Sequence, residues 1–163
     1  MKWTEIFFPF IFVWIIQLLF VDLLSIGTVR PDFPLIMILY FSVKQGRFAG
    51  VLSGFLFGLL IDLSGSAMFF GLSSLTYTIV GYISGNLKGV YNKISPILFT
   101  TSWVLVVFFH FLIFCLVQYQ ELWLVNNNLF LSKWFGTSIY TLSFLIIFQF
   151  LIPLNKESNV KSR

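Results

Sequence analysis

Only a few residues of this sequence have the type and position to do chemistry inside so apolar a chain. His110 lies deep within a long hydrophobic run, while Asp22, Asp32 and Asp62 lie at the ends of such runs, with Arg30 nearby. An ionisable side chain inside a membrane typically marks a proton pathway, a ligand site or a hydrogen bond to another helix. Pumps place such groups along a helix at mid-depth, whereas these carboxylates gather at one edge. We therefore interpret the aspartates and Arg30 as interfacial, and His110 as a neutral side chain that hydrogen-bonds to another helix.

Asp62 has the most informative neighbours of the three aspartates. It ends an apolar run and is followed by Ser64 and Gly65, which is typical of a helix end and a tight turn. Its side chain has three candidate roles: to cap the next helix, to pair with Arg30, or to face a partner protein. An intramembrane enzyme would need two polar groups at one depth, and we expect His110 to differ in depth from the aspartates.

Familiar catalytic and cofactor-binding patterns are absent from the sequence. It has no glycine-rich phosphate loop, no His-Glu-x-x-His helix and no Gly-x-Ser-x-Gly elbow. Cys115 is the only cysteine, and no second His and no carboxylate accompanies His110 in its run, which disfavours a metal site. The basic residues do not form a face with stacking partners, as nucleic-acid binding requires. We therefore expect no enzymatic activity, no cofactor and no nucleic-acid partner.

The elements that must position these residues are hydrophobic helices. Hydrophobic residues make up 58% of the chain and charged residues only 10%, against about 25% charged in soluble domains. Such a surface needs lipid around it, and lipid admits only structures that satisfy their own backbone hydrogen bonds. Six apolar runs predict an all-α, polytopic membrane protein, and they cover about residues 6–24, 33–43, 48–63, 69–87, 97–117 and 134–154.

The second and third runs are short for a crossing, which takes about 20 residues. A re-entrant hairpin would bury Lys44 and Arg47 at a cost of at least about 2.5 to 3.5 kcal/mol each, so we expect two short spanning helices. With the N-terminus inside, eight of the ten Lys and Arg residues are cytoplasmic, and only Arg30 and Lys133 are outside. The prediction is one six-helix bundle over residues 1–154 with both termini inside, an outer loop over 118–133, and a polar cytoplasmic tail over 155–163.

Glycines recur at intervals of four in the middle of the chain. Residues four apart share one helix face, and the two series are Gly46, Gly50, Gly54 and Gly58 in the third helix and Gly81 and Gly85 in the fourth. Helices in lipid associate through close packing, which glycine permits because it has no Cβ. The pattern predicts either packing against neighbouring helices of the bundle or a groove for a partner's helix.

The order of these motifs resembles the rod shape-determining protein MreD family. The resemblance is carried by Arg30-Pro-Asp-Phe-Pro, Lys44-Gln-Gly-Arg, Gly54-Phe-Leu-Phe-Gly with Asp62 after it, and Gly81-Tyr-Ile-Ser-Gly. In that family a Pro-Asp helix start precedes a basic-Gly turn, a glycine-rich helix that ends in Asp, and a Gly-Tyr-x-x-Gly helix. The similarity covers about residues 30–89, and the remainder matches only as hydrophobic helices.

The resemblance implies a non-enzymatic scaffold of the bacterial cell-wall elongation machinery, spanning the cytoplasmic (inner) membrane several times. The implied partners are an MreC-like bitopic membrane protein, bound directly, and MreB and wall-synthesis enzymes, reached through it. The family is also similar in fold to substrate-binding components of energy-coupling factor vitamin transporters. An alternative function is therefore the binding of a small molecule for transport, in an outward-facing cavity lined by aromatics such as Tyr77, Trp103 and Trp123.

Overall fold

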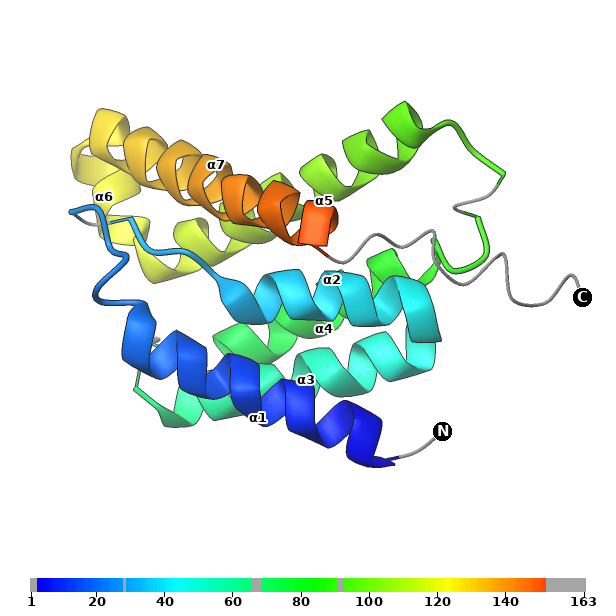
Figure 1. The fold of residues 1–163 in the computed structure, drawn as a ribbon. Helices are drawn as coiled ribbons and strands as arrows, with labels where there is room; N and C mark the ends of the chain where they lie inside the picture. The colour runs from blue at the N-terminus through cyan, green and yellow to red at the C-terminus, as the bar shows by residue number, and fades with distance from the viewer. Residues whose placement is uncertain (1–2, 28, 66–68, 91–92, 152–163) are drawn as a thin grey trace, which may run out of the picture.

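The computed structural model describes residues 3–27, 29–65, 69–90 and 93–151, and every regular element in these ranges is an α-helix (Figure 1). In chain order the helices are α1 (Trp3–Phe20), α2 (Phe33–Gln45), α3 (Arg47–Leu63), α4 (Leu72–Gly85), α5 (Pro96–Gln118), α6 (Gln120–Val125) and α7 (Asn127–Leu151). Each of the six apolar runs contains one helix. The outer loop predicted over 118–133 is wrong, because that stretch holds α6 and the first turns of α7. The predicted tail over 155–163 lies outside the described residues.

The long helices run in alternating directions (Figure 1). The start of α1, the α2–α3 turn, the α4–α5 connection and the end of α7 lie at one end of the bundle, which we name the α2–α3 end. The α1–α2 and α3–α4 connections and the short α6 lie at the other, which we name the α1–α2 end. Arg30 and Asp62 therefore lie at the α1–α2 end, whereas Lys44 and Arg47 lie at the opposite end.

Two helices in the described ranges are long and apolar enough to cross a bilayer by length and composition alone. They cover Pro96–Gln118 and Asn127–Phe150, and within an apolar stretch of 18 residues in each, only 33% and 22% of the residues, respectively, are buried in the protein. Large apolar side chains such as Leu105, Ile139 and Phe150 face outward instead. An apolar surface of this extent suits a lipid environment, because water would not solvate it.

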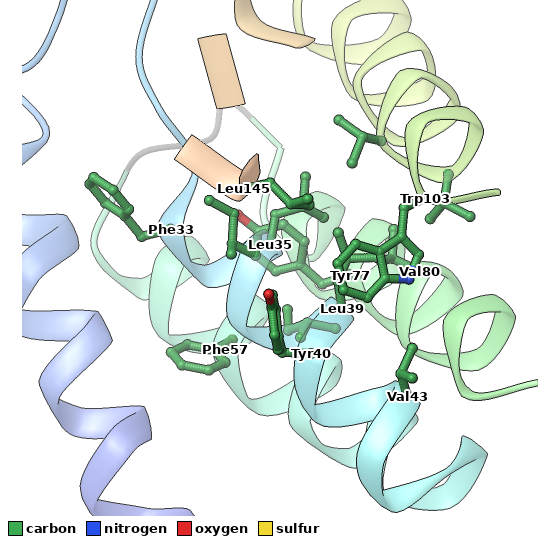
Figure 2. Close-up of a cluster of buried hydrophobic side chains, with 14 of the residues drawn as sticks. Phe33, Leu35, Leu39, Tyr40, Val43, Phe57, Tyr77, Val80, Trp103 and Leu145 are labelled. Atoms are coloured by element: carbon green, nitrogen blue, oxygen red, sulfur yellow. The ribbon is translucent and has the colours of Figure 1, made fainter. Parts of the chain in front are cut away.

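The short helix α2 forms the centre of the bundle. It packs against α1, α3, α4 and α7, and nine of its 13 residues are buried. Figure 2 shows Leu35 and Leu39 of α2 among Tyr77 and Val80 of α4 and Trp103 of α5. A helix enclosed by protein on most sides need not match the thickness of the lipid layer, which explains how α2 can be so short.

Both ends of α2 have a local cause in the sequence. At its start, the Asp32 carboxylate accepts a hydrogen bond from the Leu35 backbone N–H at 2.9 Å, and Pro34 occupies the first turn, where no N–H is needed. At its end, Gly46 has φ of 97°, a conformation that costs other residues energy. This sharp turn places α3 directly beside α2.

Candidate functional site

The glycine faces of α3 and α4 lie against each other so closely that the two backbones touch. A Cβ added at Gly54 would collide with the carbonyl of Tyr77, and one added at Gly58 would collide with the backbone of Ser74. Gly50 and Gly81 face each other in the same way. In the described structure this face of α3 is covered by α4 of the same chain, so it offers no open groove to a partner's helix.

The two remaining glycines of the pattern lie at the α2–α3 end of this interface. A Cβ at Gly85 would meet the backbone of Arg47, and one at Gly46 would lie 2.9 Å from Cδ of Lys88. The Lys88 ammonium group donates to the Gln45 carbonyl at 2.7 Å. The glycine series therefore joins α3 to α4 along its whole length, as close helix packing requires in lipid.

Asp62 caps α4 from the end of α3. Its carboxylate accepts from the backbone N–H groups of Gly71 at 3.0 Å and of Ser73 and Ser74 at 3.1 Å, and from the Ser74 hydroxyl at 2.9 Å. The residue that precedes α4 is Gly71, which has no side chain to do this itself. A carboxylate at a helix N-terminus is stabilised by the free N–H groups and by the helix dipole. Of the three roles open to Asp62, the geometry is that of a cap.

Asp32 joins four helices. Besides capping α2, its carboxylate accepts a hydrogen bond from the Tyr77 hydroxyl of α4 at 2.7 Å. Its backbone N–H donates to the Thr141 hydroxyl of α7 at 3.3 Å. Nε2 of His110, on α5, lies 3.7 Å from the same carboxylate oxygen that binds Tyr77. Gln17 of α1 holds the same segment. Its side-chain Nε2 donates to the Pro31 carbonyl at 3.3 Å, and its Oε1 accepts from the Phe33 N–H at 3.1 Å.

The expectation that His110 and the aspartates differ in depth is wrong for Asp32. The 13-residue α2 is about 20 Å long, against about 35 Å for the 23-residue α5. The start of α2 therefore lies deeper in the bundle than the end of α5, at the level of His110. There the imidazole ring is 2% exposed and stacks on the Tyr77 ring, with centroids 5.1 Å apart.

Arg30 pairs with Asp22, and the predicted alternative of a pair with Asp62 is wrong. The guanidinium lies 3.3 Å from the Asp22 carboxylate, and both side chains are more than half exposed. An exposed ion pair of this kind contributes at most about 1 kcal/mol. Three of the candidate residues lie at this end: Arg30, Asp32 and Asp62. Arg30 presents its charge to the surroundings, whereas the two aspartates face the interior.

A cavity of about 500 Å³ lies beside the Asp32 network at the α1–α2 end. Helices α1, α3, α4, α5 and α7 contribute to its wall, and so do Gly27 and the three residues Arg30, Pro31 and Asp32 that precede α2. Asp32, Tyr77 and His110 line it, and so do the two cations Arg30 and Lys133. The volume is within the range of about 300–1,000 Å³ that is typical of small-molecule sites.

Two buried polar atoms around this cavity have no hydrogen-bond partner among the described residues: Nδ1 of His110 and the Ser73 hydroxyl oxygen. Unpaired buried groups cost free energy, so native proteins usually pair them with protein, water or ligand. Within the same described ranges, no three His, Cys, Asp or Glu side chains gather as ligands for a metal ion. The site has hydrogen-bonding groups and cations, and it can hold a polar molecule.

The sequence alone did not predict that Tyr77 pairs with Asp32 or that Lys133 lines the same cavity as Arg30. A signal for Tyr77 exists, because Ser73, Tyr77 and Gly81 recur at intervals of four and so share one face of α4. A tyrosine among small residues on a buried face needs a partner for its hydroxyl. No comparable signal joins Arg30 to Lys133, which come from segments far apart in the chain.

Comparison with known proteins identifies the chain by its sequence. Residues 1–155 match the family described as rod shape-determining protein MreD. Comparison with curated proteins and with solved structures found no match. The family match extends over nearly the whole chain and includes every helix described above. The chain therefore belongs to the MreD family of rod shape-determining proteins.

Proposed function

We propose that this protein is a non-enzymatic scaffold of the bacterial cell-wall elongation machinery, which binds an MreC-like bitopic protein directly and reaches MreB and wall-synthesis enzymes through it. The observation that carries the proposal is the family match over residues 1–155, which assigns the chain to rod-shape determination. The engaged carboxylates support it, because Asp32 and Asp62 are occupied in joining helix ends. Carboxylates engaged in this way position the helices, as a scaffold requires.

We further propose that residues 1–154 cross the cytoplasmic membrane six times, with both termini and the 155–163 tail in the cytoplasm. The alternating directions of the helices support this topology (Figure 1). The cations support it as well, because Lys44, Arg47, Lys88 and Lys93 all lie at the α2–α3 end. Cytoplasmic loops carry such an excess of Lys and Arg, so this end faces the cytoplasm. A reporter fused within Asn126–Asn128 should score as external, and one fused after Leu154 as cytoplasmic; a tail that scores as external would refute the topology.

The scaffold needs a fixed shape, and the glycine contact between α3 and α4 supports one. Backbones in direct contact leave little freedom for the two helices to slide, and α2 fills the space beside them. At one end Asp62 of α3 holds the start of α4, and at the other Lys88, which follows α4, bonds Gln45 at the end of α2. A partner bound to the surface of this unit would be held at a constant position relative to the bilayer.

The direct experiment is affinity purification of the protein from its bacterium in mild detergent. We expect an MreC-like protein to be recovered with it. Gly54→Leu should abolish this recovery or prevent accumulation, because the new side chain would meet the Tyr77 backbone. Leu56→Phe is the matched control: it adds bulk to the same helix on an exposed face, and it should leave both unchanged. Recovery of a tightly bound vitamin with no such partner would refute the scaffold and favour the transport alternative.

A further inference from the structure

We propose that the cavity at the α1–α2 end binds a phosphate ester that also carries hydroxyl groups. The chemistry is shared by the headgroup of an anionic phospholipid and by a soluble polyol phosphate, and the experiment below separates these sources. The inference goes beyond the scaffold role and does not depend on any partner protein. It rests on the cations, the unpartnered polar atoms and the apolar part of the cavity wall.

The two cations of the cavity are the first reason. Under the proposed topology, Arg30 and Lys133 are the only Lys or Arg residues of the whole sequence on the outer side. They come from separate segments, one before α2 and one within α7, yet both line this cavity. Two cations that converge from different elements favour an anion with several oxygens, and phosphate is the common biological example.

The present contacts of both cations leave donors for such an anion. The Arg30 guanidinium has five N–H donors, and its contact with the exposed Asp22 occupies one side of it. The Lys133 ammonium lies 3.8 Å from the centre of the Tyr119 ring, a contact that uses the ring face and no hydrogen-bond acceptor. A phosphate would therefore meet cations that are not fully neutralised by the protein.

The unpartnered polar atoms are the reason why we expect the ligand to carry hydroxyl groups. Nε2 of His110 faces the Asp32 carboxylate at 3.7 Å, which favours a proton on that nitrogen and leaves Nδ1 as an acceptor. The Ser73 hydroxyl, also unpaired and buried, can donate or accept. A ligand hydroxyl satisfies both kinds of group. The anionic end then lies toward Arg30 and Lys133, and away from Asp32, whose charge would repel it.

The apolar part of the wall is compatible with either source. Leu18, Phe111 and Phe114 line the cavity alongside the polar groups. They could cover the first carbons of an acyl chain or the carbon skeleton of a polyol, and burial of either is favourable. The headgroup chemistry is therefore the specific part of the proposal.

The experiment uses the full chain purified in an uncharged detergent. Native mass spectrometry and thermal unfolding would measure binding of dioctanoyl phosphatidylglycerol and of glycerol 3-phosphate, with dioctanoyl phosphatidylcholine as a phosphate-bearing lipid whose headgroup lacks free hydroxyls. We expect at least one of the first two to bind, and to bind about tenfold or more tightly than phosphatidylcholine. Binding of phosphatidylglycerol alone would assign a lipid headgroup, whereas comparable binding of glycerol 3-phosphate would assign a soluble ligand.

Variants test the assigned contacts. Arg30→Gln combined with Lys133→Gln should weaken binding about tenfold or more, and Arg30→Lys with Lys133→Arg should restore it. The control is Arg47→Gln with Lys93→Gln, which removes the same charge at the α2–α3 end and should change nothing. Equal binding by the Arg30→Gln, Lys133→Gln protein and the wild type would overturn the proposal. Failure of both phosphatidylglycerol and glycerol 3-phosphate to bind would also overturn it.

Ser73→Ala keeps the proposal testable if the charge variants do not fold. The Ser73 hydroxyl has no partner, so its removal should not lower the stability of the unliganded protein, but it should weaken ligand binding severalfold. Ser84→Ala is the matched control, because Ser84 is buried and unpartnered on the same helix but does not line the cavity. Equal affinities of the two variants for the probe would refute the assigned hydroxyl contact.

Discussion

Replacement of Asp62 by Asn is the most direct test of how the helix ends are held. The side chain keeps its size and loses its charge and one acceptor oxygen. In the native protein Oδ1 accepts from the Ser73 N–H, while Oδ2 accepts from the N–H groups of Gly71 and Ser74 and from the Ser74 hydroxyl. An Asn amide has one acceptor oxygen, so in either orientation at least one backbone N–H at the start of α4 is left without its acceptor.

The expected loss can be estimated from these contacts. Asp62 is 6% exposed, so water cannot easily replace the missing acceptor. A buried donor left unpaired costs about 1–3 kcal/mol, and loss of the favourable charge at a helix N-terminus adds about 0.3–2 kcal/mol. We therefore expect Asp62→Asn to lower the free energy of unfolding by about 1–5 kcal/mol.

The assay compares unfolding of the variant and the wild type in detergent, followed by tryptophan fluorescence. Asp22→Asn is the control, because it removes an equal charge from the exposed pair with Arg30 and should cost less than about 1 kcal/mol. If Asp62→Asn proved as stable as Asp22→Asn, the cap would not hold α4 in place. The structural role assigned to Asp62 would then have to be abandoned.

Three further predictions concern the same bundle. Tyr77→Phe removes the hydroxyl that donates to Asp32 and should lower the free energy of unfolding by about 1–3 kcal/mol in the same assay, whereas a wild-type value would exclude a stabilising bond. Gly81→Ala places a Cβ against the Gly50 carbonyl and should destabilise by about 1–3 kcal/mol or more; unchanged accumulation and stability would refute the close contact. Gln17→Leu removes both bonds to the segment before α2, and it should increase proteolytic cleavage there in detergent. A cleavage pattern equal to that of the wild type would show that these bonds do not hold the segment.

The positions of helices could be predicted well because hydrophobicity acts locally along the chain. All six apolar runs contain a helix, and α5 begins and ends within one residue of the run predicted over 97–117. The exception is the 118–133 stretch, where Trp123 and Leu124 lie in a short helix instead of a loop. Its mixture of polar and apolar residues has no clear period, so the local signal was too weak to predict α6.

The candidate site was less predictable than the helices, because it depends on the relative heights of separate elements. The spacing of Gly54 and Gly58 predicts a flat face, but only the packed structure reveals that α4 of the same chain covers it. The approach of His110 to Asp32 results from the difference in length between α5 and α2. No pattern within either segment contains that information.

The sequence by itself determined that this is a helical, lipid-compatible chain with cations sorted between its loops, because composition and periodicity are properties of each segment alone. Family membership also follows from sequence, since it depends on the order of motifs along the chain. The tertiary structure alone decided that Asp62 caps α4, that Arg30 pairs with Asp22, and that Lys133 shares a cavity with Arg30. These contacts join residues from different helices, and their geometry is set only when close packing fixes how far each helix is shifted along its neighbours.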